Sequence, residues 1–162
     1  MSEEQTTDNI ETTTATTAVV EKAPRPVAEQ KPAKYGYWWG TGRRKAAVAR
    51  VRIRPGDGKF VINGKEVDEY FTELRDQQFA VAPMKETDTL GKLDVFVNAN
   101  GGGYTGQAGA VLLGVARALL AYDPTLEQTL RDNEFLSRDS RRVERKKPGQ
   151  PGARKRFQFS KR

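Results

Sequence analysis

The stretch KLDVFVNANGGGYTGQAGAVLLGVARALLAY, residues 92–122, decides the fold of this chain. It begins with an apolar strand over residues 93–97 and then enters the glycine cluster Gly101–Gly103. Beyond the glycines, apolar residues recur with the i, i+3, i+4, i+7 spacing of one buried helix face. These residues are Ala108, Val111, Leu112, Val115, Ala116, Leu119 and Leu120. The stretch therefore predicts a strand, a tight turn and a helix, in that order.

A second ridge, made of small residues, runs along the same predicted helix. It consists of Gly106, Ala110, Gly114 and Ala118. Small side chains let another backbone come close, and that backbone can belong to a sheet or to RNA. Of these two partners we favour the sheet. The pair Asp123-Pro124 then ends the helix and predicts a cap for a further short helix.

The segment before this stretch carries strand and turn signals. Residues 47–54 alternate, which predicts a half-buried strand with a stripe of guanidinium groups. One side holds Ala49, Val51 and Ile53, and the other holds Val48, Arg50, Arg52 and Arg54. Residues 55–58, Pro-Gly-Asp-Gly, have turn chemistry, and the apolar pattern resumes over residues 59–63. We therefore expect a β-hairpin of these two strands.

Shorter elements are expected between the hairpin and the decisive stretch. Asn63-Gly64 predicts a second turn. Residues 68–74 predict a short helix, and residues 76–82 predict another that Pro83 stops. The mixture of strands and helices predicts an α/β (α+β) fold.

The chain of 162 residues is long enough for one domain of ordinary size. Residues 1–34 are rich in Thr and Pro and offer few large apolar groups, so we expect a disordered extension. Residues 35–137 form the predicted globular body. Residues 138–162 form a tail in which Pro and Gly exclude a continuous helix, and we expect it to become ordered only against an anion.

The positive charge of the chain belongs to this tail. The whole chain has a formal net charge of +7, yet residues 138–162 carry 11 basic and 2 acidic side chains, whereas the body carries 13 of each. Such a concentrated positive field attracts polyanions, above all nucleic acid, through counterion release. A tail that merely keeps the protein in solution is the alternative.

The composition excludes most enzyme chemistry. There are no cysteines and no histidines, so disulfides, thiol nucleophiles and imidazole bases are absent. We expect no catalytic residues, no metal, no cofactor and no small-molecule substrate. No apolar run approaches the roughly 18 residues that span a bilayer, and the N-terminus lacks the pattern of a signal peptide, so we expect a cytoplasmic protein without a membrane partner.

Two motifs have competing interpretations. Gly101-x-Gly103-x-x-Gly106 satisfies the local form of a dinucleotide-binding turn, but no apolar strand follows the predicted helix, and this makes nucleotide binding a minor alternative. Residues 40–45, Gly-Thr-Gly-Arg-Arg-Lys, place three cations behind flexible glycines and next to Trp38-Trp39. That arrangement suits phosphate binding, and the alternative is a solvated run of charge beside tryptophans at a domain edge.

Four motifs in this order resemble one family, the bacterial small-subunit ribosomal protein S-nine family. They are Gly40-Thr41-Gly42-Arg43-Arg44-Lys45, Gly101-Gly102-Gly103 with Gly106-Gln107-Ala108-Gly109-Ala110, Val143-Glu144-Arg145-Lys146-Lys147, and Gln158-Phe159-Ser160-Lys161-Arg162. The resemblance covers about residues 36–162. It implies a body like the second domain of ribosomal protein S-five, with a left-handed βαβ crossover.

The resemblance also implies partners. The body binds small-subunit rRNA in the head of the subunit, beside neighbouring head proteins, and the tail threads through rRNA toward the peptidyl-site tRNA. The expected rRNA-binding residues are Arg43, Arg44, Lys45, Arg50, Arg52, Arg138, Arg141, Arg142, Arg145, Lys146, Lys147, Arg154, Lys155 and Arg156. The expected tRNA-binding residues, near the anticodon stem-loop, are Ser160, Lys161 and Arg162.

Two other classes of function remain as alternatives. One is a nucleotide-dependent enzyme that uses the glycine turn, which requires saturable nucleotide binding to the body. The other is a histone-like DNA-packing protein that uses the tail, which requires the protein to be found with the nucleoid and not with ribosomal particles.

Overall fold

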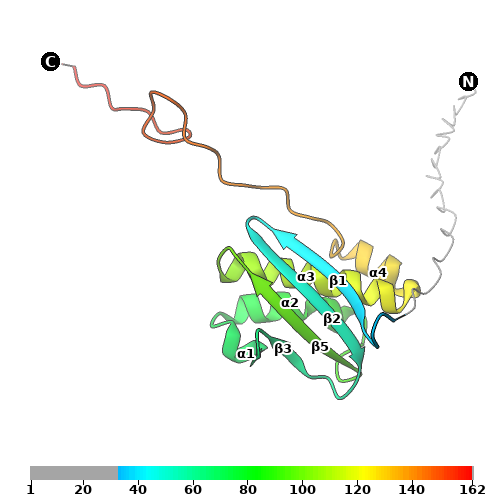
Figure 1. The fold of residues 1–162 in the computed structure, drawn as a ribbon. Coiled ribbons are helices and arrows are strands. Elements are labelled where there is room, and N and C mark those ends of the chain that lie inside the picture. Colours follow the sequence, from blue (N-terminus) through cyan, green and yellow to red (C-terminus); the bar gives the residue numbers. More distant parts are fainter. Residues whose placement is uncertain (1–32, 162) are drawn as a thin grey trace, which may run out of the picture.

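The computed structural model describes residues 33–161, which form a mixed α/β body and an extended C-terminal segment (Figure 1). The strands are β1 Trp38–Arg44, β2 Ala47–Pro55, β3 Phe60–Ile62, β4 Lys65–Glu66 and β5 Leu93–Asn100. The helices are α1 Val67–Tyr70, α2 Leu74–Glu86, α3 Tyr104–Tyr122, the 3-10 helix η1 Pro124–Leu126, and α4 Glu127–Asp132. Of the predicted disordered extension, residues 1–32 lie outside the described residues.

The five strands form one mixed sheet with the order β1-β2-β5-β3-β4. The pairs β1–β2, β2–β5 and β3–β4 are antiparallel, whereas β3 and β5 are parallel neighbours connected through β4, α1 and α2. Helices α2, α3 and α4 lie behind the sheet in Figure 1, and within residues 33–161 no helix covers the front. The sheet therefore has a covered face and an open face.

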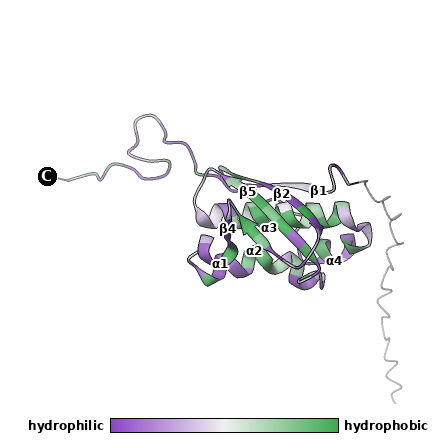
Figure 2. Cartoon of the chain, turned by 60° about the horizontal axis from the view of Figure 1, so that its bottom comes forward, coloured by the Kyte–Doolittle hydropathy of each residue, from purple (hydrophilic) through white to green (hydrophobic). Residues whose placement is uncertain are grey.

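The predicted strand, turn and helix of residues 92–122 are confirmed as β5, a glycine turn and α3. Gly101 and Gly102 have φ angles of +74° and +66°, a backbone conformation that side chains disfavour. The predicted apolar face of α3 is buried, except that Leu120 is half-buried. In Figure 2, α3 and the central strands are largely hydrophobic, which agrees with a core between sheet and helices.

The ridge of small residues on α3 packs against the sheet, as predicted. A Cβ added to Gly42 of β1 would lie 1.8 Å from the carbonyl oxygen of Ala110, and one added to Gly40 would lie 2.1 Å from that of Gly114. These distances leave no room for any side chain on β1 at the two positions. The sequence-based description of Gly40 and Gly42 as flexible was wrong, because both are strand residues on which α3 rests.

The predicted β-hairpin of residues 47–54 and 59–63 is wrong. Both strands form, but β5 lies between β2 and β3. The connecting turn wraps around the end of β5, where the Asp94 carboxylate accepts hydrogen bonds from the backbone N–H groups of Asp57 and Lys59 at 3.0 and 3.1 Å. Those two hydrogen bonds satisfy backbone N–H groups of the turn and hold it at the end of β5, with β3 on the far side of that strand.

The predicted short helices are only partly correct. Helix α1 ends at Tyr70, and Leu74 begins α2, so the expected helix over residues 68–74 is divided between the two. Pro83 does not stop α2 but lies buried inside it, near its C-terminal end. A proline removes one backbone hydrogen bond, and here Pro83 is buried, as is its neighbour Met84. The turn predicted at Asn63-Gly64 is confirmed and joins β3 to β4.

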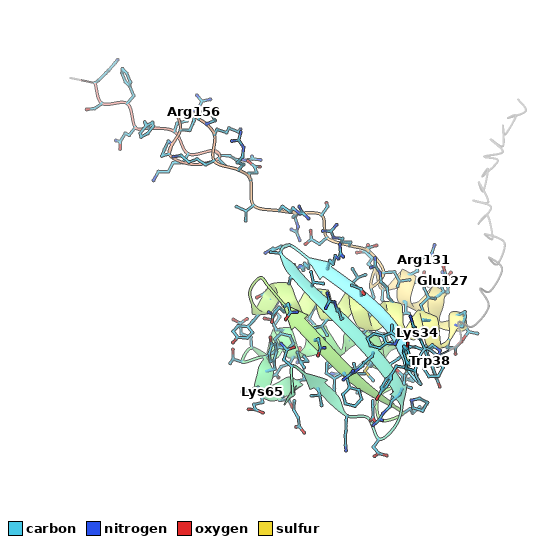
Figure 3. All side chains as sticks on the ribbon, viewed as in Figure 1. Lys34, Trp38, Lys65, Glu127, Arg131 and Arg156 are labelled. Atoms are coloured by element: carbon cyan, nitrogen blue, oxygen red, sulfur yellow. The ribbon has the colours of Figure 1, made fainter. Side chains whose placement is uncertain are left out.

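The segment after α3 closes one end of the body. The Asp123 carboxylate accepts a hydrogen bond from the N–H of Thr125 at 2.9 Å and so caps η1, as predicted. Trp38, labelled in Figure 3, packs edge-on against Tyr122 at the end of α3, with ring centroids 4.9 Å apart. Among the described residues no helix has the length and apolarity to cross a membrane.

Candidate nucleic-acid interface

The tail leaves the body as an extended chain. Residues 138–161 contain no helix and no strand, and Figure 1 shows them running away from the sheet. Arg156 lies far from the body, on the outer part of this chain (Figure 3). Figure 2 shows the tail as mainly hydrophilic. The absence of a helix was predicted from the Pro and Gly residues, and it exposes the tail cations on all sides.

The root of the tail is tied to the body by Asp139. Its carboxylate accepts from the guanidinium of Arg44 at 3.5 Å and from that of Arg141 at 2.9 Å. Arg44 also donates to the carbonyl oxygen of Thr105 at 3.0 Å. A Cβ on Gly109 would lie 2.3 Å from Cδ of Arg44, so this glycine makes room for the arginine along α3. The arrangement fixes where the tail leaves the body.

Hydrogen bonds from the side chain and the backbone of Arg141, with a smaller effect of Arg44, hold the pKa of Asp139 well below its usual range. A carboxyl with a lowered pKa stabilises the fold above its unfolded-state pKa and loses this effect as pH falls through the folded-state value. The Asp139 contacts are therefore fully formed at neutral pH and are lost only in strong acid.

The outer tail contains one loop with its own ion pair. The Arg154 Nε donates to both carboxylate oxygens of Glu144 at 3.1 Å, and this bond lowers the pKa of Glu144. The backbone N–H of Lys147 donates to the carbonyl oxygen of Gly152 at 3.4 Å. Arg154 is thus the one outer cation paired with a carboxylate within residues 33–161.

The motif of residues 40–45 divides into two roles. Arg43, at the end of β1, and Lys45, in the following turn, are exposed. Arg44 between them is mostly buried and already holds Thr105 and Asp139. Two of the three predicted cations are therefore free to meet a phosphate, and the third connects β1, α3 and the tail.

The guanidinium stripe of β2 lies on the open face of the sheet. Arg50 is exposed, Arg52 is half-buried, and Arg54 pairs with Asp94 at 3.2 Å. Sequence reasoning missed two rings at this place, Tyr37 and Phe96, which pack against these arginines. The available signal was the alternation of β5, because Leu93, Val95 and Val97 face the core and Phe96 must then face outward.

The glycine turn packs against the connection between β1 and β2. A Cβ on Gly101 would lie 2.7 Å from the carbonyl oxygen of Ala46, and one on Gly102 would lie 3.1 Å from Cβ of Ala47. The glycines thus let the turn rest against the β1–β2 connection. Within residues 33–161, α3 is followed by η1 and α4 and by no further strand, so the parallel strand that the dinucleotide fold requires is missing.

The end of the tail is only partly described. Ser160 and Lys161 are exposed, and Arg162 lies outside the described residues.

We expect Asp139→Ala to loosen the root of the tail while the body stays folded. The backbone N–H of Arg141, which donates to Asp139 Oδ1 at 3.0 Å, should exchange its hydrogen about two- to tenfold faster. Amide hydrogen exchange measures this, and Asp139→Asn, which keeps a neutral acceptor, should fall between. Asp57→Ala is the control, because its side chain makes no hydrogen bond within residues 33–161. Equal exchange in all variants would contradict the role of Asp139.

Comparisons with known proteins agree on one family. The family model described as ribosomal protein S9/S16 matches residues 42–162. A relative from Anaeromyxobacter sp. (strain K), named small ribosomal subunit protein uS9, is 57% identical over 121 residues, which cover 75% of this chain and 93% of the relative. The protein of that name from Thermotoga neapolitana is 53% identical over 128 residues, covering 77% and 96%. The protein named uS9m from Arabidopsis thaliana is 52% identical over 127 residues, covering 78% of this chain and 30% of the relative.

Proposed function

Because the chain belongs to the ribosomal protein S9/S16 family and is a structural constituent of the small ribosomal subunit, we propose that its body and tail bind rRNA in the subunit head. The end of the tail then reaches the anticodon stem-loop of the peptidyl-site tRNA. The protein acts in the cytoplasm, in the ribosome, beside neighbouring head proteins. Because the family is ribosomal, the chain is not an enzyme, and the nucleotide-dependent and DNA-packing alternatives are set aside.

The observation that supports this proposal is that most described cations of the tail are not paired with a carboxylate within residues 33–161. Its two carboxylates, Asp139 and Glu144, are already paired with Arg141 and Arg154. The other described tail cations make no ion pair within residues 33–161, and they are Arg138, Arg142, Arg145, Lys146, Lys147, Lys155, Arg156 and Lys161. An extended chain of unpaired cations follows a phosphate backbone without reading its sequence, which suits binding to rRNA and to every tRNA.

We propose that three segments of the chain have different roles. We infer that residues 1–34 are an accessory extension, residues 35–137 the rRNA-binding body, and residues 138–162 the tail. In the body, the residues that contact rRNA are Arg43, Lys45, Arg50 and Arg52. The parallel neighbours β3 and β5, joined through two helices, support a βαβ unit in a body like the second domain of ribosomal protein S-five, and the left-handed crossover is what the family resemblance implies.

Deleting residues 160–162 is expected to weaken the binding of the peptidyl-site tRNA roughly tenfold, because two cations that contact its phosphates are lost and each such solvent-exposed contact is weak. Subunit assembly should be unchanged, because only these two cations are removed from the tail. The measurement is the dissociation rate of tRNA from small subunits that contain the truncated protein. Lys161→Ala and Arg162→Ala should each give part of the effect.

A matched control is Lys65→Ala, which removes one exposed cation from the edge of the sheet, far from the tail in Figure 3. It should leave tRNA dissociation unchanged. Wild-type dissociation in all three tail variants would remove these residues from the tRNA site.

A further inference from the structure

The open face of the sheet carries a row of aromatic and cationic side chains. Trp39 of β1 lies opposite Arg52 of β2, and Arg52 lies opposite Phe96 of β5. Tyr37, just before β1, packs edge-on against both rings, with centroids 6.5 Å from Trp39 and 6.3 Å from Phe96. Trp39 keeps 48% of its surface exposed and donates its indole N–H to the carbonyl oxygen of Lys34. Its ring is therefore held in place and still open to solvent.

The arginines in this row are held by rings. The Cζ atom of Arg52 is 5.5 Å from the ring centroids of both Tyr37 and Phe96, and that of Arg54 is 5.9 and 5.3 Å from them. Asp94, whose side chain is 6% exposed, balances the charge of Arg54. Arg52 makes no ion pair within residues 33–161, so its charge remains uncompensated on a fixed, flat guanidinium.

Further cations extend this row along the strands. Arg50 lies opposite Thr41 on one side and Asn98 on the other, and Arg43 follows at the end of β1. Within the described part of the chain neither arginine makes an ion pair or a side-chain hydrogen bond. The open face thus has four arginines on β1 and β2, against the carboxylates of Asp94 on β5 and Glu66 on the edge strand β4, and this excess of positive charge is complementary to a polyanion.

We propose that this face binds an unpaired nucleotide segment of RNA, with a base stacked on Trp39 and Arg52 and the adjoining phosphates on Arg50 and Arg43. This inference rests on the proposed function and deepens it, because it states that the body binds an unpaired strand and does so by stacking on a base as well as through its arginines. Exposed aromatic and guanidinium planes on a sheet are a recurrent way to bind splayed bases, and flanking cations follow the backbone.

The rings favour a single strand over the other polyanions of a cell. A duplex hides the faces of its bases and is bound through phosphates and sugar hydroxyls, for which cations alone suffice. An acidic peptide also needs only the cations. A fixed, half-exposed indole beside an uncompensated guanidinium binds most strongly to a partner that has both a planar face and a negative charge.

Tryptophan fluorescence tests the proposal in the full-length chain. The chain has two tryptophans, and Trp38→Phe, which keeps a ring against Tyr122, leaves Trp39 as the only one. Titration with single-stranded oligoadenylate should quench Trp39 to saturation, whereas an RNA duplex of equal length should quench it much less. In the wild-type background, Trp39→Ala should weaken oligoadenylate binding by about five- to a hundredfold, and Trp39→Phe should restore most of the affinity.

The control is Phe79→Ala, which removes a ring of similar exposure, 43%, from α2 on the other layer of the body. It should bind oligoadenylate like the wild type. Fluorescence anisotropy of a labelled oligonucleotide reports total binding, to which the tail contributes. Binding by anisotropy without quenching of Trp39 would overturn this inference and leave the proposed function intact, whereas absence of any RNA binding would overturn both. Stronger quenching by the duplex or by polyglutamate would assign the face to another partner and overturn the inference.

Discussion

Truncation after Arg145 is expected to lower the affinity of the protein for small-subunit rRNA on the order of a hundredfold at moderate salt. The change removes seven of the eleven tail cations, and only one of these, Arg154, is paired within the described residues. If about half of the seven meet phosphates, the slope of log affinity against log salt should fall by about 2 to 3 units. Binding titrations at several salt concentrations measure both quantities.

The control for this truncation is a body variant with two exposed cations of α2 neutralised, Arg75→Gln with Lys85→Gln. It should keep the wild-type slope, because α2 lies behind the sheet and away from the tail. A slope that is unchanged after truncation, or one that the body variant lowers equally, would show that the tail does not carry the electrostatic binding.

Gly42→Ala is expected to destabilise the body by about 3 kcal/mol or more, at the upper end of overpacking effects. The added Cβ would lie 1.8 Å from the carbonyl oxygen of Ala110 and 2.5 Å from the backbone nitrogen of Gly114. Both atoms belong to the backbone of α3, so no side-chain rotation relieves the contact, and the helix must move away from β1. Urea and thermal unfolding followed by circular dichroism measure the loss, with a midpoint lower by more than about 10 °C.

Gly103→Ala is the matched control, because nothing lies within 4 Å of its added Cβ and its φ angle is −109°. We expect it to change stability by less than about 1 kcal/mol, since it alters only the first position before α3. If Gly42→Ala were as stable as Gly103→Ala, the close approach of β1 and α3 would be wrong.

The fold could be predicted where the signal is local. The period of 3.6 on residues 108–120 and the alternation on residues 47–54 identify α3 and β2, because burial of one face imposes these spacings whatever the partner. The continuation of α2 through Pro83 could not be predicted in this way. Whether a helix continues through a proline depends on how much of the turn around it is buried, and Pro83 is buried.

The interface could be predicted where it depends on composition. The tail stands out in the sequence because eleven cations lie among residues that cannot form a helix or a core. The use of Arg44 as a link to Thr105 and Asp139 could not be read from the chain, because Asp139 lies 95 positions away. Charge alone makes Arg43, Arg44 and Lys45 equivalent, and only the structure separates them.

The sequence by itself therefore determined β2, β5, α3 and the helix-free tail, and which faces of β2 and α3 are buried, but it did not identify β1 as a strand. Only the tertiary structure decided the order of the strands, because a period of two assigns each side chain to a face but does not name the neighbouring strand. In the observed order β5 lies between β2 and β3, and the Asp94 carboxylate of β5 accepts two backbone hydrogen bonds from the turn that connects them. That order also brings Phe96 of β5 into one row with Trp39 and Arg52, which come from the consecutive strands β1 and β2.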